Sequence, residues 1–421
     1  MIKALNTLIY SCFFLSCFVW QGVVQFDLKL IYLVLLLFIS LVLLYGKALI
    51  INRCVLLVLV FFTCVSFVMV WLGNAQIFSI LSTALGIEIF CIATFTFFSI
   101  NQNQIPSVAK RYISIAVLLA GLSLVQQLCF VLQLKYGYDY SYFLPIWRFG
   151  GFEGFLMRVN SLFPEPAHFA YFLSPALFLS VRRLFFREFF FVTRTQSLII
   201  FAANLLTFSS IAYLSLILCV LFSLPYKKLC QKPLRIFTAA LFLCTLIILA
   251  VTKSESVSIR VNSVIDLLAS NSSSLQNPSV FAFYSNFLVA KDSFFSNPIF
   301  GSGLNSSYTN YLEHLGNYFD VNYVQELGLF GLTARDTGSL FLRIPSELGL
   351  FGIAVLLLFL WRFKVRKSIN YKYYVLSKMC LLFFVVYALR IGHYFLFELW
   401  FFMAMYVYLH KKQHDSTFSR D

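Results

Sequence analysis

Long apolar runs, separated by short charged turns, recur along the whole chain. Within these runs the apolar residues are continuous and do not alternate with polar ones, which favours membrane-spanning helices over an outer-membrane barrel. We expect an all-α polytopic membrane protein with about twelve spanning helices. Their predicted ranges are 5–22, 29–45, 54–72, 77–99, 112–132, 167–181, 196–208, 210–224, 236–251, 346–361, 379–391 and 396–410.

Two stretches, 196–224 and 379–410, are each too long for one untilted helix and short for two, because a full span needs about 20 residues. The flanking charges require an even number of crossings in each stretch. We therefore predict two short helices in each, with outward turns at Ser209-Ser210 and at 390–393. A tilted helix or a thinned bilayer can accommodate such short spans.

The charges are distributed by side. The 421 residues carry a net charge of +15, with 60% hydrophobic and 12% charged residues. Most of the 32 lysines and arginines fall in short segments that the predicted topology places on one face, the pattern of a cytoplasmic surface. This pattern explains the net positive charge without a nucleic-acid partner.

The ten cysteines form no CxxC pair, so we expect them in apolar packing and predict no metal site.

The predicted helices divide the chain into six segments. We interpret the first apolar run as a spanning helix and not as a removed signal peptide, and we expect both termini to be cytoplasmic. The large outer loop at 252–345 indicates chemistry at the outer surface, because long loops in ordered domains usually have a function. The segments are helices in 1–132, a first outer segment 133–166, helices in 167–251, the loop 252–345, helices in 346–410 and a tail 411–421.

The first outer segment ends in Arg158, Glu165 and His168, close together before a helix. Pro166 suits the first position of that helix, so Glu165 has two interpretations: a partner of the helix dipole, or a group that contacts substrate. His168 also has two interpretations, a packed residue or a catalytic one, and a histidine in a first helical turn is more often packed. Both residues are candidates for acid–base chemistry.

A second group closes the large loop. Arg335 and Arg343 are candidate ligands for a diphosphate, because a guanidinium offers several fixed donors, and Asp336 is a candidate base. The alternative for Arg335 and Asp336 is a surface salt bridge of little energetic value. A helix from Thr337 would place Arg343 on one face with the serine four residues before it. Arg260 and Arg390 add outward positive charge, although snorkelling also explains Arg390.

The order of four motifs resembles that of a known family. Arg158-x-x-Ser161-x-Phe163-x-Glu165-Pro166, Leu206-Thr207-Phe208-Ser209-Ser210, Asn297-Pro298-x-Phe300-Gly301-x-Gly303 and Ser346-Glu347-Leu348-Gly349-Leu350-Phe351-Gly352 are similar to motifs of bacterial O-antigen and capsule repeat-unit polymerases (the Wzy type). The match covers roughly residues 155 to 400. Ser210 departs from the pattern, since arginine is common at that position in the family.

The resemblance implies a GT-C-like fold in the bacterial inner membrane and metal-independent glycosyl transfer, without a cofactor, at the periplasmic face. Donor and acceptor would be oligosaccharide repeat units on undecaprenyl diphosphate, and a chain-length regulator would be a further partner. The implied diphosphate ligands are Arg158, Arg335 and Arg343, then Arg260 and Arg390. The implied bases are Glu165 and Asp336, then His168 and His393.

Two other functions stay open. An O-antigen ligase of the same superfamily is the nearest alternative, although ligases tend to carry His-Asn before the Glu-Leu-Gly motif, where this chain has Asp336-Thr337-Gly338-Ser339. A transporter of lipid-linked oligosaccharides is the third, but we find no internal repeat of the kind that transporters often show. The Gly301-Ser302-Gly303 turn is interpreted as a hinge and not as a phosphate cradle.

Overall fold

The computed structural model describes residues 2–15, 19–20, 28–50, 53–71, 77–144, 146–224, 278–367 and 370–418. The predicted helix 236–251 and Arg260 lie outside these residues. The elements up to residue 157 are α1 (Ile2–Ser11), η1 (Cys12–Phe14), β1 (Val19–Trp20), β2 (Leu28–Lys29), α2 (Leu30–Leu44), α3 (Arg53–Trp71), α4 (Ile77–Ile100), η2 (Gln102–Gln104), α5 (Ile105–Val131), α6 (Lys135–Tyr138), β3 (Phe152–Glu153) and β4 (Leu156–Met157).

The remaining described elements are all helical. The only sheets among the described residues are two antiparallel pairs, β1 with β2 and β3 with β4. The helices after residue 157 are α7 (Pro166–Phe185), α8 (Arg194–Leu206), α9 (Ser210–Ser223), α13 (Pro278–Ser296), α14 (Ser307–His314), η4 (Leu315–Asn317), α15 (Val321–Glu326), α16 (Leu340–Arg362), α17 (Tyr371–Arg390) and α18 (Phe397–Phe418).

Most described helices lie close to the ranges expected from the hydropathy pattern. The predicted first helix, 5–22, is wrong at its end: the helical stretch of α1 and η1 stops at Phe14, and Val19–Trp20 forms the strand β1. The two doubtful stretches are each broken into two helices, α8 with α9 and α17 with α18. In the described chain, four helical stretches are long and apolar enough to cross a membrane: Ile80–Ile100, Gln102–Val131, Leu340–Arg362 and Tyr371–Arg390. The protein is therefore mostly helical, and its long apolar helices indicate a membrane-embedded fold.

Three predicted helix starts are wrong. Helix α5 begins at Ile105, so Arg111 lies inside the helix, where its guanidinium packs 5.4 Å from the ring centre of Tyr10. Helix α17 begins at Tyr371 because the Asn370 side chain accepts a hydrogen bond from the backbone N–H of Tyr373 (3.2 Å). The last correction concerns α16.

Helix α16 begins at Leu340, later than the predicted Thr337 and earlier than the predicted membrane boundary. Thr337 (φ 53°) and Gly338 (φ 64°) have left-handed backbone conformations, which a right-handed helix cannot include. Ser339 is the residue before the first helical turn, and its hydroxyl donates to the Ala388 carbonyl (2.8 Å) instead of capping the helix. The side-by-side placement of Ser339 and Arg343 is retained, because the Arg343 N–H donates to the Ser339 carbonyl (2.9 Å).

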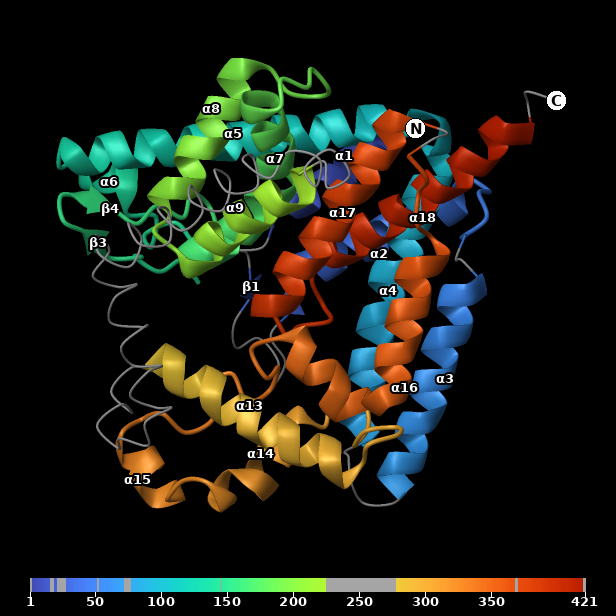
Figure 1. Ribbon diagram of the computed structural model, residues 1–421, viewed down its shortest axis with the longest axis vertical. Helices are drawn as coiled ribbons and strands as arrows, with labels where there is room; N and C mark the ends of the chain where they lie inside the picture. Colours follow the sequence, from blue (N-terminus) through green and yellow to red (C-terminus); the bar gives the residue numbers. More distant parts are fainter. Residues whose placement is uncertain are drawn as a thin grey trace, which may run out of the picture.

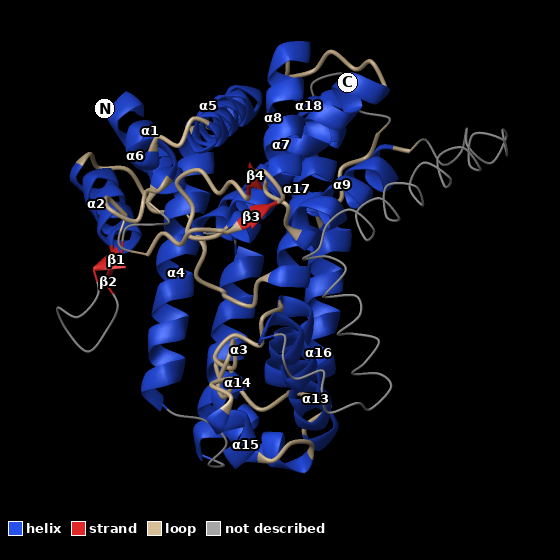
Figure 2. Cartoon of the chain, turned by 90° about the vertical axis from the view of Figure 1, so that its left-hand side faces the viewer, coloured by secondary structure: helices blue, strands red, loops and turns tan. Residues whose placement is uncertain are grey.

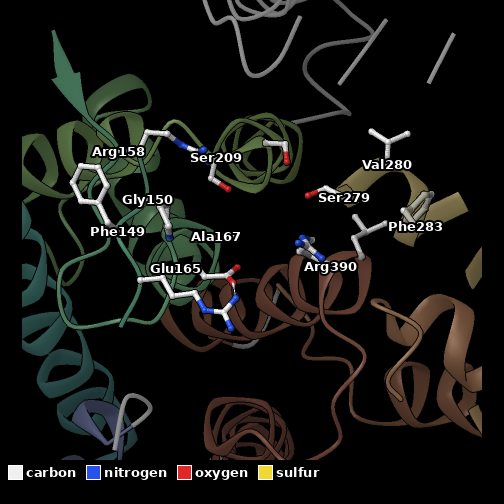
Figure 3. A pocket seen from close by; sticks show the side chains of 14 residues that line it. Phe149, Gly150, Arg158, Glu165, Ala167, Ser209, Ser279, Val280, Phe283 and Arg390 are labelled. Carbon is white, nitrogen blue, oxygen red and sulfur yellow. Dashed lines mark ion pairs between the residues drawn. The ribbon is translucent and has the colours of Figure 1, made fainter. Parts of the chain in front are cut away.

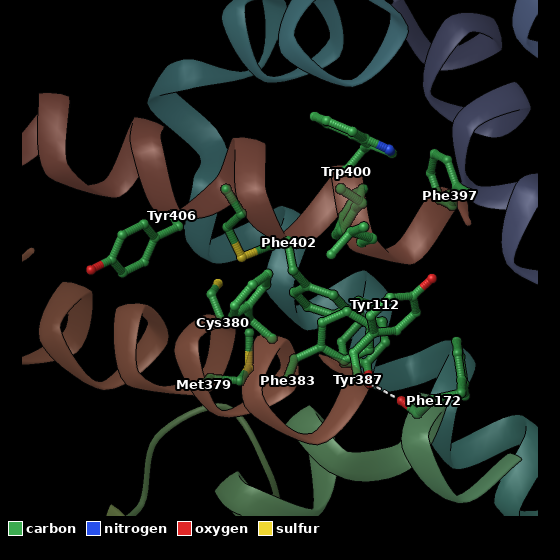
Figure 4. Packing of buried hydrophobic residues seen from close by; sticks show 14 of the residues in the cluster. Tyr112, Phe172, Met379, Cys380, Phe383, Tyr387, Phe397, Trp400, Phe402 and Tyr406 are labelled. Atoms are coloured by element: carbon green, nitrogen blue, oxygen red, sulfur yellow. Dashed lines mark hydrogen bonds between the residues drawn. The ribbon is translucent and has the colours of Figure 1, made fainter. Parts of the chain in front are cut away.

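The core is an aromatic cluster at the centre of the bundle (Figure 4). Phe13 packs 5.0 Å from the rings of both Phe397 and Phe401, and the Tyr112 hydroxyl donates to the Phe172 carbonyl (2.6 Å). Helix α7 is buried along most of its length. Four described cysteines are buried as predicted, namely Cys12, Cys91, Cys219 and Cys380, whereas Cys64 is exposed.

The described part of the large loop forms a separate helical layer. In Figure 1, α13, α14 and α15 lie at the bottom of the view, while α7, α8 and both chain ends lie in the upper half. Figure 2, turned about the same vertical axis, shows the same separation. Helix α13 packs against α16.

A break in α16 attaches this layer to the bundle. Gly349 (φ 61°) interrupts the helix and leaves backbone groups on both sides of it without helical partners. The segment 297–303 supplies those partners through four hydrogen bonds between backbone groups. They join Ser302 N to Ser346 O (3.0 Å), Gly303 N to Glu347 O (3.0 Å), Leu350 N to Pro298 O (2.8 Å) and Phe351 N to Ile299 O (3.0 Å).

Two glycines make this contact possible. A β-carbon at Gly301 would overlap the Glu347 carbonyl, and one at Gly349 would overlap the Ile299 carbonyl. Both residues also have positive φ, 70° and 61°, which side chains rarely adopt. The Gly301-Ser302-Gly303 segment is thus held against α16 on both sides. Its backbone contacts with α16 give this segment an attachment role that the sequence did not predict.

Candidate functional site

A cavity with a volume of about 520 Å³, lined by polar and charged side chains, lies where the first outer segment meets α13 (Figure 3). We call it the arginine cavity. Its lining residues come from the outer segment, the starts of α7, α9 and α13, and the end of α17. They are Arg148, Phe149, Gly150, Arg158, Glu165, Pro166, Ala167, Ser209, Ser210, Ser279, Val280, Phe283, Leu389 and Arg390.

The outer segment is folded tightly under the cavity. Asn160 donates from its amide to the Arg148 carbonyl (3.1 Å) and the Phe163 carbonyl (2.8 Å). The Ser161 hydroxyl donates to the Leu119 carbonyl (2.9 Å) on α5. The polar residues of this motif are therefore structural, and they fix the backbone that carries the charged side chains.

Gly150 lets two parts of the segment touch. A β-carbon there would lie 2.6 Å from the Pro166 ring and 2.7 Å from the Arg158 carbonyl, closer than any real contact. The backbone N–H of Arg158 also donates to the Gly151 carbonyl (3.0 Å). Arg158 and the start of α7 are consequently brought to the same wall of the cavity.

Arg158 is half-buried and incompletely satisfied. Its Nε atom is buried without a hydrogen-bond partner in the structure. Burial lowers the pKa of the Arg158 guanidinium, while the nearby carboxylates of Glu153 and Glu165 oppose that shift. A guanidinium remains charged despite such a shift, so this side chain is suited to an anionic ligand.

Glu165 is the residue immediately before α7, and Pro166 takes the first helical position as predicted. Its carboxylate makes no capping hydrogen bond, although it keeps its place at the positive end of the α7 dipole. The carboxylate Oε1 instead lies 3.7 Å from Nη1 of Arg148, and both side chains are substantially exposed (41% and 79%). Glu165 is thus accessible from the cavity.

The electrostatics of the arginine cavity favour an anion. Three arginines, Arg148, Arg158 and Arg390, face one glutamate among the lining residues. The starts of α7, α9 and α13 also meet there, and neither Glu165 nor Ser209 caps its helix with its side chain. Helix N-termini carry partial positive charge and available N–H groups, so they add to the attraction of the arginines for phosphate oxygens.

Arg343 does not contribute to this cavity. It is buried (1% exposed), and its Nε donates to Glu347 Oε1 (2.8 Å), its Nη1 to the Gly392 carbonyl (2.9 Å) and its Nη2 to Asn305 Oδ1 (2.5 Å). Its guanidinium also lies 4.4 Å from the ring centre of Tyr394. These contacts argue against the predicted role as a diphosphate ligand and make Arg343 a structural residue.

Glu347 is equally committed. Its carboxylate accepts hydrogen bonds from Asn305 N (2.9 Å), Ser307 N (3.3 Å), the Ser307 hydroxyl and the Tyr394 hydroxyl (3.1 Å). The Arg343–Glu347 pair therefore connects the loop before α14 to α16 and to the turn between α17 and α18. The family-like Ser346-Glu347-Leu348-Gly349 motif is therefore an attachment point in this structure.

Two candidate bases contact each other outside the arginine cavity. Oδ2 of Asp336 lies 3.0 Å from Nε2 of His393, whose side chain is half-exposed (47%). The contact depends on Gly392, because a β-carbon there would overlap the Asp336 carbonyl. An aspartate that orients a histidine is an arrangement found in general base catalysis. His393 lies in the turn that follows Arg390, whereas Asp336 lies in the segment before α16.

The remaining predicted residues lie elsewhere. Arg335 is exposed on the loop, with its guanidinium 5.8 Å from the ring centre of Tyr308. His168 is half-buried in the first turn of α7, with its ring 5.7 Å from that of Tyr171. The described residues contain no group of three or more His, Cys, Asp or Glu side chains that could hold a metal ion.

Sequence reasoning missed Arg148 and Ser279. Arg148 lies in an aromatic and glycine-rich stretch without a recognisable motif. Its positive charge in a predicted outer segment was the one signal that could have indicated it. Three described helices, α7, α8 and α9, lie between Arg158 and Ser279 in the chain, so only the folded protein brings the two residues together (Figure 3).

No family model matches this chain, and neither a curated protein nor a solved structure matches it.

Proposed function

We propose that this protein polymerises oligosaccharide repeat units carried on undecaprenyl diphosphate, and that the arginine cavity binds the diphosphate. The observation that carries the proposal is the convergence of Arg148, Arg158, Arg390 and Glu165 on one cavity at the loop-bearing end of the bundle. The order of the four motifs in the sequence supports the same family. The proposal includes twelve spans, an inner-membrane location and a cavity that faces the periplasm.

The donor glycan would enter with its diphosphate against the three arginines. An acceptor sugar hydroxyl attacks the anomeric carbon, a new glycosidic bond forms, and the bond between that carbon and the diphosphate oxygen breaks. The lipid diphosphate leaves with the bonding electrons. Negative charge then grows on the phosphate oxygens, where fixed guanidinium groups and helix N-termini stabilise it.

Glu165 is the base that we favour within the cavity. Its exposed carboxylate would accept the proton of the attacking hydroxyl and release it to solvent after the lipid diphosphate departs. Arg148, 3.7 Å away, holds the carboxylate in place. The Asp336–His393 pair is the second candidate base, because its histidine lies in the turn that follows Arg390.

The decisive experiment measures glycan chain length in a deletion strain complemented with variants. Arg148→Ala and Arg158→Ala should each reduce polymer synthesis by about a hundredfold or more, the usual effect of removing one preorganised charge from a transition state. Glu165→Gln should reduce it by about a hundredfold or more because it removes the proposed general base. Lys291→Ala is the matched control, because Lys291 is exposed on α13 and does not line the cavity. Its chain lengths should be normal.

The same strain separates the competing functions. A polymerase defect leaves single repeat units attached to lipid A-core, whereas a ligase defect leaves long chains on the lipid carrier and none attached. Normal chain lengths in Arg158→Ala and Glu165→Gln, at normal protein level, would overturn the site. Accumulated polymer on the carrier in the deletion strain would overturn the polymerase assignment in favour of the ligase.

A further inference from the structure

A second basic cavity lies at the opposite end of α7 from the arginine cavity. It has a volume of about 370 Å³ and is formed by the connection between α7 and α8. In Figure 1 this connection is at the top of the view, far from the layer of α13 to α15. We call it the α7–α8 pocket. Its lining residues are Arg183, Leu184, Arg187, Phe189 and Arg194.

The positive charge of this pocket has no acidic side chain among its lining residues to balance it. The one acid in the connecting sequence, Glu188, is already bound. Its carboxylate accepts from Nε (2.9 Å) and Nη2 (2.5 Å) of Arg182 and from the Tyr371 hydroxyl (2.6 Å). Three arginines therefore converge with no protein counter-charge in the lining.

The pocket also contains an unsatisfied donor. Nε of Arg183 is buried without a hydrogen-bond partner, and its guanidinium lies 4.1 Å from the ring centre of Phe189. A buried N–H of a charged group without a partner is costly, so an anion that accepts from it would stabilise this geometry.

Two backbone features concentrate the charge further. Arg194 is the first residue of α8, at the positive end of the helix dipole, where a cation is unfavourable unless an anion is nearby. Arg187 has a left-handed backbone conformation (φ 54°), which turns the chain back over the pocket. The position of Arg194 is favourable if a negatively charged group occupies the pocket.

The neighbouring aromatic side chains indicate where that group comes from. Phe185 and Phe189 are exposed at this end of α7 (54% and 76%). Phenylalanines beside arginines at a helix end suit the boundary between lipid tails and head groups, and they do not suit water. A soluble phosphate ion has no apolar part that would contact these phenylalanines.

We propose that the α7–α8 pocket binds the phosphate of an anionic phospholipid on the face of the membrane opposite the arginine cavity. The three guanidinium groups contact the head group, and Phe185 and Phe189 contact its acyl chains. This site is independent of the glycan reaction. It fixes the far end of α7, the helix whose other end carries Glu165.

The test uses the full chain purified in zwitterionic detergent and titrated with phosphatidylglycerol, with phosphatidylcholine and inorganic phosphate as separate probes. Bound lipid is counted by native mass spectrometry. We expect phosphatidylglycerol to be retained and the other two probes to be lost. Arg183→Gln/Arg187→Gln/Arg194→Gln should weaken retention by about a hundredfold, at about fivefold for each basic residue that contacts an anionic surface.

Lys110→Gln is the matched control, because Lys110 is an exposed basic residue near the start of α5 and does not line the pocket. It should retain the lipid normally. The single variants serve if the triple variant does not purify. Equal retention in wild type and arginine variants would overturn the proposal, and so would retention of inorganic phosphate alone. Polymer chain length is a separate readout, so failure here leaves the proposed function untouched.

Discussion

The buried pair of Arg343 and Glu347 allows a sharp separation of structural from functional arginines. We predict that Arg343→Ala destabilises the protein by about 3–5 kcal/mol, the usual result of removing one partner of a buried ion pair. The change would leave a buried carboxylate (0% exposed) without its cation and would remove donors from the Gly392 carbonyl and the Asn305 side chain.

The magnitude follows from the contacts. Four other donors, from Asn305, Ser307 and Tyr394, would still face Glu347 after the substitution. These donors surround a carboxylate that is paired with Arg343. Without Arg343, the buried Glu347 carboxylate must bind a proton or a water molecule. Glu347→Ala should cost a similar amount, because it leaves the buried guanidinium of Arg343 uncompensated.

The assay is a reversible unfolding titration in mixed micelles, followed by a double-variant cycle. The joint variant Arg343→Ala/Glu347→Ala should cost less than the sum of the single variants, because neither partner is then left alone. Arg148→Ala is the control: its side chain is 79% exposed, so its free energy of unfolding should change by about 0.5 kcal/mol or less. Normal stability of Arg343→Ala with lost polymer synthesis would refute the structural role and restore Arg343 as a ligand.

Three further predictions concern local geometry, each measured in the same unfolding titration. Gly301→Ala should lower the free energy of unfolding by more than the 1–2 kcal/mol expected for left-handed strain alone, because its β-carbon would overlap the Glu347 carbonyl. Gly328→Ala isolates that strain, since Gly328 has φ 65° but open space around it; equal effects at the two glycines would contradict the docking argument. Gly392→Ala should be as disruptive as Gly301→Ala, and a neutral result would mean that the turn can move away from Asp336. Tyr112→Phe should cost about 1 kcal/mol through loss of the hydrogen bond to Phe172, and a stabilising effect would show that this bond is not needed.

Hydropathy was sufficient to predict where most described helices lie, because continuous apolar runs have few other structures available. The distribution of charged residues was sufficient to predict the breaks at Ser209 and after Arg390, because it required an even number of crossings in each stretch. Neither signal could predict the break at Gly349, which lies inside an apolar run. That break depends on backbone partners from 297–303, far away in the sequence.

The candidate site was predicted only in part for a similar reason. Arg158, Glu165 and Arg390 were singled out from the sequence, and they line one cavity. Arg343 has the same residue type and also flanks a predicted membrane helix, yet it is buried against Glu347. Burial and pairing decide whether an arginine is available to a ligand, and both are properties of the folded chain.

The attachments of the large loop explain how a distant segment could shape the arginine cavity. The segment 297–303 is bonded to the break in α16, Asn305 and Ser307 are bonded to the Arg343–Glu347 pair, and Asp336 contacts the turn that follows Arg390. Helix α13 immediately precedes the first of these attachments, and its first turns provide Ser279, Val280 and Phe283 to the cavity wall. A loop attached at three points cannot move one wall of the cavity without straining the other attachments. The motifs at 297–303 and 346–352 therefore hold α13 opposite Arg158 and Glu165.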